Sequence, residues 1–405
     1  MKNLGIILVC ICSILTTSAQ KPLNFSISGK IEGAQKGDTL RFMTVSSDWK
    51  QQTPVFDVVV GRSGKVKYKG SHLYSQNYVY FFHPKDTSYK VHSSRYSSSL
   101  FLTDAEVRIE ADREYIYHPT LTGGVYDKEL QLIKEKENSV GKERDSIYQC
   151  LKSAERCADT AQIRKFVEEF NSFLSQKEIK ERRAEIENLT QEYLHNYSNE
   201  YVVYELLTSY SYMTLDSLEN YYDKQIESVK DSYYGVALHN KITLLKALEP
   251  QMPAPEFTLT TITDEVVTNK DLLGKYVLIY HYGMCPGSLS LDKKLSDWYV
   301  EHKDKAEVIG YTSTRESIVK MAEGIKSGDK LMGFDLYEAL QSMVNHPWKY
   351  EVDAGRNDAN GALEKIYDFR GLPFFILISP EGKILDRSFT TFYSGSLDVV
   401  DAPVQ

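Results

Sequence analysis

The sequence has no excess of basic residues, and no apolar run as long as a membrane-spanning helix. Its 405 residues include 48 Lys and Arg against 56 Asp and Glu, a formal charge of −8, and no Lys/Arg cluster interleaved with aromatic residues. Nucleic-acid-binding proteins neutralise phosphates with such clusters, so we expect no nucleic-acid partner. A spanning helix needs about eighteen apolar residues or more. The composition, 42% hydrophobic, instead predicts a globular chain of two or three domains.

Sequence patterns for metal and nucleotide binding are also missing. The nine histidines show neither H-x-x-H nor H-x-x-x-H spacing and do not cluster with cysteines, so a metal site is not indicated. There is no G-x-x-x-x-G-K-[ST] loop and no G-x-G-x-x-G segment to hold phosphates. We therefore expect no metal and no cofactor.

Cysteine is scarce, and two of the five cysteines lie in an N-terminal segment typical of a secretory signal. Lys2 precedes the apolar run Leu4–Leu15, and small residues follow up to Ala19, after which a signal peptidase would cleave. Cys10 and Cys12 would leave with this segment. We expect a mature chain that is exported to the periplasm or cell envelope and has no transmembrane segment.

Three kinds of pattern follow along the mature chain. The first contains short alternating runs such as Lys65–Lys69, separated by turn residues, and predicts an antiparallel β-sandwich or barrel. The second lacks proline and is rich in Lys, Glu, Leu and Ile, which predicts helices. The third begins after the stiff segment Pro250–Pro255 and alternates strands with helices, which predicts an α/β sheet with mixed pairing. The expected fold class is multidomain α+β, divided into a signal peptide (1–19), a β-rich domain (20–120), a helical region (121–250) and an α/β domain (251–405).

Cys285 lies between a predicted strand, Tyr276–Tyr280, and a helix predicted from about Ser288 to His302. A thiol at the start of a helix faces unpaired backbone N–H groups and the positive end of the helix dipole, and both favour the thiolate. Pro286 suits the first helical turn, where no N–H is needed. The position predicts a reactive cysteine; the alternative is a buried cysteine that packs as a small apolar residue.

One enzyme class with this local spacing is the α/β-hydrolases. Gly283 and Gly287 flank Cys285 as in a nucleophile elbow, and His302 or His346 could complete a triad. That mechanism needs a backbone N–H on the residue after the nucleophile, which Pro286 lacks. A cysteine-nucleophile hydrolase is therefore our third hypothesis.

Residues 253–390 resemble the TlpA/ResA-like branch of the thioredoxin superfamily in three segments. These segments are Ala254–Leu259, Lys270–Leu278 and Gly371–Lys383. The β domain and helices before them resemble an arrangement common in exported Bacteroidota proteins, whose N-terminal β domain has no known function. The resemblance implies a thioredoxin-like fold in which Pro373 is cis and faces Cys285, and Leu372 offers its backbone to a bound peptide.

The chain departs from the family at the site itself. The family's Trp-Cys-x-x-Cys is here a degenerate CxxS sequence, in which Ser288 replaces the resolving cysteine. Cys285 could attack a disulfide, but Ser288 could not release the partner. The family's acid in the preceding strand is replaced by Tyr280, and Tyr282 stands where a peroxiredoxin has Thr. The resemblance implies catalytic positions at Cys285, Ser288 and Pro373, and substrate-binding positions at Met284, Pro286, Gly287 and Leu372.

The remaining cysteines, Cys150 and Cys157, lie seven residues apart in a predicted helix. Their Cα atoms would be about 10.5 Å apart, whereas a disulfide needs about 4.4 to 6.8 Å. We expect them not to pair with each other but to share one helix face, where they pack, contact another domain or bridge to a second chain.

The leading hypothesis is an exported thiol-disulfide oxidoreductase with a single active-site cysteine. Cys285 would form mixed disulfides with envelope proteins or small thiols, and a membrane-bound reductant is a further candidate partner. The competing hypothesis is a redox-inactive binding or scaffold protein of the cell envelope. His281, four residues before Cys285, is interpreted as a hydrogen-bonded strand residue, with polarisation of the thiolate as its alternative.

Overall fold

The computed structural model describes residues 22–45, 52–85, 97–157, 159–328, 330–331, 334–358 and 361–401. The expected signal peptide, with Cys10 and Cys12, lies outside these residues. The chain divides into two compact units: one extends to Ser209 and also includes Asn220–Leu238, and the other contains Tyr210–Glu219 and the residues from His239 onward. Within the described residues, none of the helices has the length and apolar character needed to cross a membrane.

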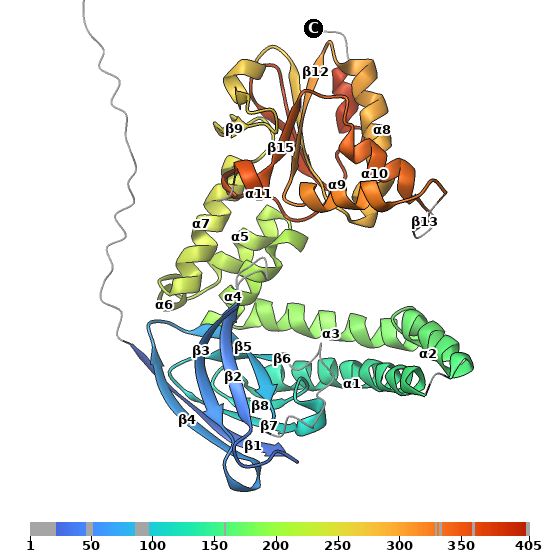
Figure 1. Ribbon diagram of the computed structural model, residues 1–405. Helices are drawn as coiled ribbons and strands as arrows, with labels where there is room; N and C mark the ends of the chain where they lie inside the picture. Colours follow the sequence, from blue (N-terminus) through green and yellow to red (C-terminus); the bar gives the residue numbers. More distant parts are fainter. Residues whose placement is uncertain are drawn as a thin grey trace, which may run out of the picture. The chain divides into compact units, whose positions relative to one another are not determined.

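The first unit contains two four-stranded sheets (Figure 1). One has the order β4-β1-β7-β8 and the other the order β3-β2-β5-β6. The strands are β1 (Leu23–Glu32), β2 (Thr39–Val45), β3 (Gln52–Val59), β4 (Lys65–His72), β5 (Gln76–His83), β6 (Ser97–Leu102), β7 (Glu106–Asp112) and β8 (Thr120–Gly123). Strands β1 and β7 pair in parallel, whereas the sequence predicted antiparallel strands. Among the described residues, neither sheet closes into a barrel.

Alternation of side chains explains why these segments form strands with one face toward a core. In β7, Val107 and Ile109 are fully buried, whereas the charged residues Glu106, Arg108 and Glu110 are exposed. A period of two puts these two sets on opposite faces of the sheet. The same alternation in the sequence predicted this strand.

Helices make up the rest of the first unit and extend into the second. They are α1 (Lys128–Arg156), α2 (Thr160–Phe173), α3 (Lys177–Asn196), α4 (Glu200–Ser209), α5 (Leu215–Asp223), α6 (Glu227–Lys230) and α7 (Tyr233–Ala247). Asp127 caps α1 by accepting a hydrogen bond from the Leu130 N–H at 2.9 Å. Cys150 lies in α1 and Cys157 at its C-cap, and both are free and exposed, so packing into a core is wrong for them.

The second unit is built on a five-stranded mixed sheet with the order β15-β12-β11-β16-β17. Its strands are β11 (Tyr276–His281), β12 (Ala306–Thr312), β15 (Tyr350–Asp353), β16 (Phe374–Ile378) and β17 (Ile384–Ser388). Strands β11, β12 and β15 are parallel to one another, and β16 is antiparallel to both β11 and β17. The α/β sheet with mixed pairing expected for this part of the chain is confirmed.

Helices and short strands complete this unit. The helices are α8 (Pro286–His302), α9 (Arg315–Gly324), α10 (Leu336–Val344), α11 (Ala354–Asn357) and α12 (Ala362–Ile366). The short strands are β9 (Thr258–Thr260), β10 (Val266–Thr268), β13 (Lys330–Leu331) and β14 (Phe334–Asp335). In the described part of both units, the 3-10 segments are 62–64, 113–115, 210–212, 269–272 and 396–400.

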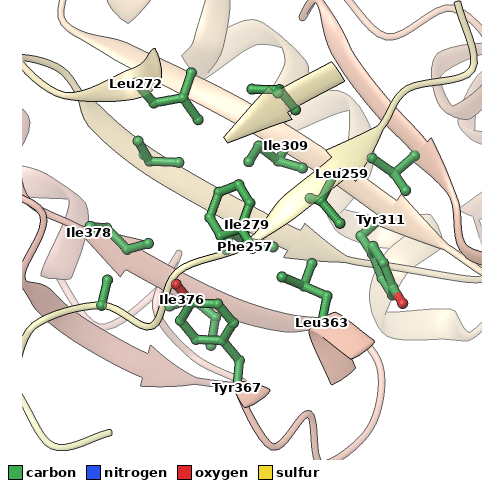
Figure 2. Close-up of a cluster of buried hydrophobic side chains, with 14 of the residues drawn as sticks. Phe257, Leu259, Leu272, Ile279, Ile309, Tyr311, Leu363, Tyr367, Ile376 and Ile378 are labelled. Carbon is green, nitrogen blue, oxygen red and sulfur yellow. The ribbon is translucent and has the colours of Figure 1, made fainter. Parts of the chain in front are cut away.

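Two apolar cores lie on the two faces of this sheet. Ile279 belongs to the core drawn in Figure 2, with Phe257, Tyr311 and Ile376. Leu278 and Tyr280 belong to the other core, which the apolar residues of α8 and α10 complete. Because successive strand residues point to opposite faces, β11 presents Tyr280 to α8.

A buried carboxylate ties α7 to the end of the sheet within this unit. Asp368 accepts hydrogen bonds from Lys241 Nζ and the Tyr210 hydroxyl, both at 2.6 Å, and from Arg370 Nε at 3.3 Å. Burial opposes its charge, but the hydrogen bonds from Lys241 and Tyr210 outweigh burial and lower the pKa of Asp368.

Candidate active site at Cys285

Cys285 is the N-cap residue of α8, with extended backbone angles of φ −88° and ψ 156°. Its Sγ accepts a hydrogen bond from the Ser288 N–H at 3.4 Å, and Pro286 occupies the first helical turn. The thiol is free and half-buried. The sulfur therefore lies at the N-terminus of a 17-residue helix, the end at which the helix dipole is positive.

Ser288 lies directly against the sulfur. Its side chain is fully buried, and its Oγ is 3.2 Å from Cys285 Sγ and accepts a hydrogen bond from the Gly283 N–H at 3.3 Å. The two side chains meet because residues three apart on a helix lie on one face. The hydroxyl can donate a hydrogen bond to the sulfur but cannot form a disulfide with it.

Pro373, the residue before β16, packs against the cysteine loop, and the Leu372–Pro373 peptide bond is cis. Gly287 allows this contact, because a Cβ at that position would lie 2.7 Å from Pro373 Cδ. A Cβ at Gly283 would lie 2.7 Å from Leu372 Cδ1. Pro373 and the Cys285 sulfur thus both lie next to Gly287, since a Cβ at Gly287 would also be 3.9 Å from Cys285 Sγ.

The expected substrate-binding residues differ in exposure. Leu372 is 38% exposed, and Pro286 and Gly287 are also exposed beside the half-buried thiol. Met284 is partly buried and packs against the core that contains Tyr280. All four residues therefore have some exposed surface, with the least at Met284.

A buried polar cluster lies behind Ser288. The Tyr280 hydroxyl donates a hydrogen bond to Asp292 Oδ1 at 3.3 Å and interacts electrostatically with Ser288. His346 Nε2 is 3.0 Å from the same oxygen, and its Nδ1 is 2.9 Å from Glu351 Oε2. All of these side chains are almost completely buried.

The buried environment shifts the titration of two of these groups strongly. Burial raises the pKa of Tyr280 well above its usual range, so its hydroxyl keeps its proton. Burial also opposes the charge of His346, but the hydrogen bonds to Asp292 and Glu351 outweigh burial and raise the pKa of His346 to about 9.

His281 does not take part in this cluster. Its ring packs against Tyr311 and Phe369, which lie on the other side of the sheet from α8. Its Nδ1 has no hydrogen-bond partner among the described residues, and burial lowers its pKa to about 4. Its Nε2 lies 3.8 Å from a Glu364 carboxylate oxygen. No contact between the ring and the Cys285 thiol is found among the described residues, because alternation along β11 turns the side chain to the other face of the sheet.

The geometry does not support a hydrolase triad. His302 lies close to the Trp298 carbonyl oxygen and to Asp401, at 2.6 and 3.1 Å. Both ring nitrogens of His346 likewise face carboxylates rather than the thiol. The residue after Cys285 is the proline that begins α8, so the backbone N–H of an elbow-type oxyanion hole is missing.

Sequence reasoning missed Asp292, Glu351 and the role of His346. Asp292 is seven residues after Cys285, and residues at this helical spacing lie on one face, so its position could have been noticed. His346 and Glu351 carry no local signal, because the pairing of β15 with β12 brings Glu351, and His346 in the segment before β15, to the site.

Comparison with known proteins gives structural neighbours only. No family model matches the chain, and no curated protein matches it. The thioredoxin domain of a thiol-disulfide oxidoreductase from Bacteroides vulgatus is 21% identical, covers 38% of this chain and 99% of its own, and has a TM-score of 0.27. A thiol:disulfide interchange protein from Bacteroides sp. is 22% identical, covers 39% and 95%, and has a TM-score of 0.28. A candidate DsbE from Chlorobium tepidum is 17% identical, covers 38% and 99%, and has a TM-score of 0.26.

Proposed function

We propose that the chain exchanges thiols and disulfides through Cys285 alone. The observation that carries this is the half-buried Cys285 sulfur at the start of α8, held by the N–H and hydroxyl of Ser288, with Pro373 packed next to Gly287 of the same loop. The thiolate attacks one sulfur of a partner disulfide, forms a mixed disulfide and expels the other sulfur as a thiolate.

The second half of the exchange needs an external thiol. Ser288 occupies the position from which a second cysteine would attack the mixed disulfide. A thiolate from a small thiol or an envelope protein attacks the partner's sulfur, so that Cys285 leaves as the thiolate and a new disulfide forms on the partner. We further propose that the chain is exported and meets these partners in the cell envelope.

Capture of mixed disulfides tests the reaction at Cys285. The purified full chain would be incubated with a model disulfide and quenched with acid, and modified peptides would be identified by mass spectrometry. We expect the adduct on the Cys285 peptide, and its loss in Cys285→Ala. Cys150→Ala is the matched control, since this exposed cysteine lies in the other unit. An adduct yield on Cys285 no higher than that on Cys150 would contradict the proposal.

Restoring the missing cysteine gives a second test. Because Ser288 Oγ is only 3.2 Å from the sulfur, we expect Ser288→Cys to form a disulfide with Cys285 and to reduce insulin faster than the wild type. Ser290→Cys is the control, because Ser290 bonds to the Gly287 carbonyl oxygen and lies off the Cys285 face. A folded Ser288→Cys chain with no gain in reductase activity would instead favour the binding or scaffold protein, whose groove would no longer accept disulfides.

A further inference from the structure

The arrangement of hydrogen bonds around His346 determines its charge. One ring nitrogen faces the Asp292 carboxylate at 3.0 Å and the other faces Glu351 at 2.9 Å. An ionised carboxylate only accepts hydrogen bonds, so both ring nitrogens must carry protons when both acids are ionised. His346 is then an imidazolium buried between two anions.

The buried cluster is electrically balanced as a whole. Glu351 also lies 3.5 Å from an Arg315 nitrogen and accepts hydrogen bonds from the Tyr282 hydroxyl and from Trp348 Nε1 at 2.8 Å. Two carboxylates, from α8 and β15, therefore face two cations, His346 and Arg315 of α9. Buried charges are tolerated in such balanced sets, whereas one unpaired charge is costly.

A short chain of hydroxyl groups connects this cluster to the thiol. Asp292 accepts a hydrogen bond from Tyr280 at 3.3 Å, Tyr280 interacts electrostatically with Ser288, and Ser288 Oγ lies 3.2 Å from Cys285 Sγ. The Ser288 hydroxyl has one proton and can donate it either to Tyr280 or to the sulfur. A stronger negative charge at Asp292 would hold the Tyr280 proton and orient the Ser288 proton away from a thiolate.

We propose that His346 is a positioning residue that neutralises Asp292, so that the Ser288 hydroxyl donates to the Cys285 thiolate. The proposal deepens the thiol exchange proposed above and rests on it in taking Cys285 as the exchanging thiol. Without the imidazolium, the Asp292 charge acts on the thiolate in two ways: it repels it directly and it turns the hydroxyl chain away from it.

The test is the pH profile of Cys285 alkylation in the full chain. Iodoacetamide reacts with the thiolate, and mass spectrometry of the Cys285 peptide separates it from the exposed Cys150 and Cys157. In His346→Gln the cluster gains one net negative charge, and we expect the midpoint of the profile to rise by about one pH unit. In Asp292→Asn the cluster gains one net positive charge, and we expect the midpoint to fall.

The double variant gives a matched control for charge. Combining His346→Gln with Asp292→Asn removes one charge of each sign, so we expect its midpoint to return to within about 0.3 pH unit of the wild type. If His346→Gln alone does not fold, the other three proteins test the proposal. We then expect the Asp292→Asn midpoint to lie below those of the wild type and the double variant. Equal midpoints in all folded variants would overturn the proposal.

The outcomes of the two sets of experiments can be told apart. Equal midpoints together with normal capture of mixed disulfides would overturn the role of His346 and leave the proposed exchange intact. Ordered midpoints without capture at Cys285 would support the electrostatic role and overturn the exchange.

Discussion

Replacing Gly287 by Ala should destabilise the second unit, although alanine normally favours a helix. The added Cβ would lie 2.7 Å from Pro373 Cδ, closer than Cβ atoms approach other heavy atoms. The proline ring is fixed to the backbone and cannot rotate away. Overpacking of this kind costs about 1 to 3 kcal/mol, while the gain in helix propensity is at most about 1 kcal/mol.

Two other glycines provide graded controls for this prediction. A Cβ at Gly283 would meet the flexible end of Leu372 at 2.7 Å, so Gly283→Ala should cost less than Gly287→Ala. A Cβ at Gly324, the last residue of α9, meets nothing within 4 Å, so Gly324→Ala should be neutral or stabilising by up to about 1 kcal/mol.

The assay is urea unfolding followed by tryptophan fluorescence, since two of the three tryptophans, Trp298 and Trp348, lie in the second unit. We expect Gly287→Ala to be less stable than Gly324→Ala by about 1 to 3 kcal/mol, with Gly283→Ala between them. Equal stability of Gly287→Ala and Gly324→Ala would refute the close packing of Pro373 on the cysteine loop.

Further predictions concern the buried charges of the same unit. The pKa of His346 is raised to about 9, so its protonation stabilises the fold by up to about 3 kcal/mol below pH 6.5, and this stabilisation is lost as the pH rises through 9. In urea unfolding, His346→Gln should therefore reduce the fall in the free energy of unfolding between pH 6.5 and 9. The pKa of His281 is lowered to about 4, so its effect on stability has the opposite pH dependence: stability is retained above pH 6.5 and lost as the pH falls through 4. His281→Phe should remove this loss of stability in acid. Asp368→Asn should cost about 3 to 5 kcal/mol, because Lys241 and the neighbouring arginines lose their buried anion, and a loss below about 1 kcal/mol in the same assay would contradict this.

Local patterns predicted much of the fold because they depend only on neighbouring residues. The period of two in Glu106–Glu110 placed a strand that the structure contains, and the proline-free segment before Pro250 is helical. The predicted helix from about Ser288 begins at Pro286, which confirms it to within two residues. The parallel pairing of β1 with β7 was missed, because no local pattern states which strand lies beside which.

The division at 120 and 250 stays a prediction, as do the signal peptide and export. The helices after Glu200 illustrate why such boundaries are difficult to place. Tyr210–Glu219 groups with the second unit, whereas Asn220–Leu238 groups with the first. Sequence composition is similar across both segments, so only the contacts made in the folded chain distinguish them.

The sequence by itself determined the local chemistry at Cys285. A cysteine after a strand and before a helix, followed by proline and a serine three residues later, is enough to place the thiol at a helix N-terminus beside a hydroxyl group. Helix geometry makes these contacts, and it depends only on spacing along the chain.

Only the tertiary structure decided what lies behind that thiol. Asp292, His346 and Glu351 meet because strand order puts β15 next to β12 and because Tyr280 faces α8. Three titratable residues spread over sixty positions have no detectable pattern in the sequence. Once burial has removed water from these side chains, each carboxylate needs a nearby opposite charge, and the imidazolium between them provides it.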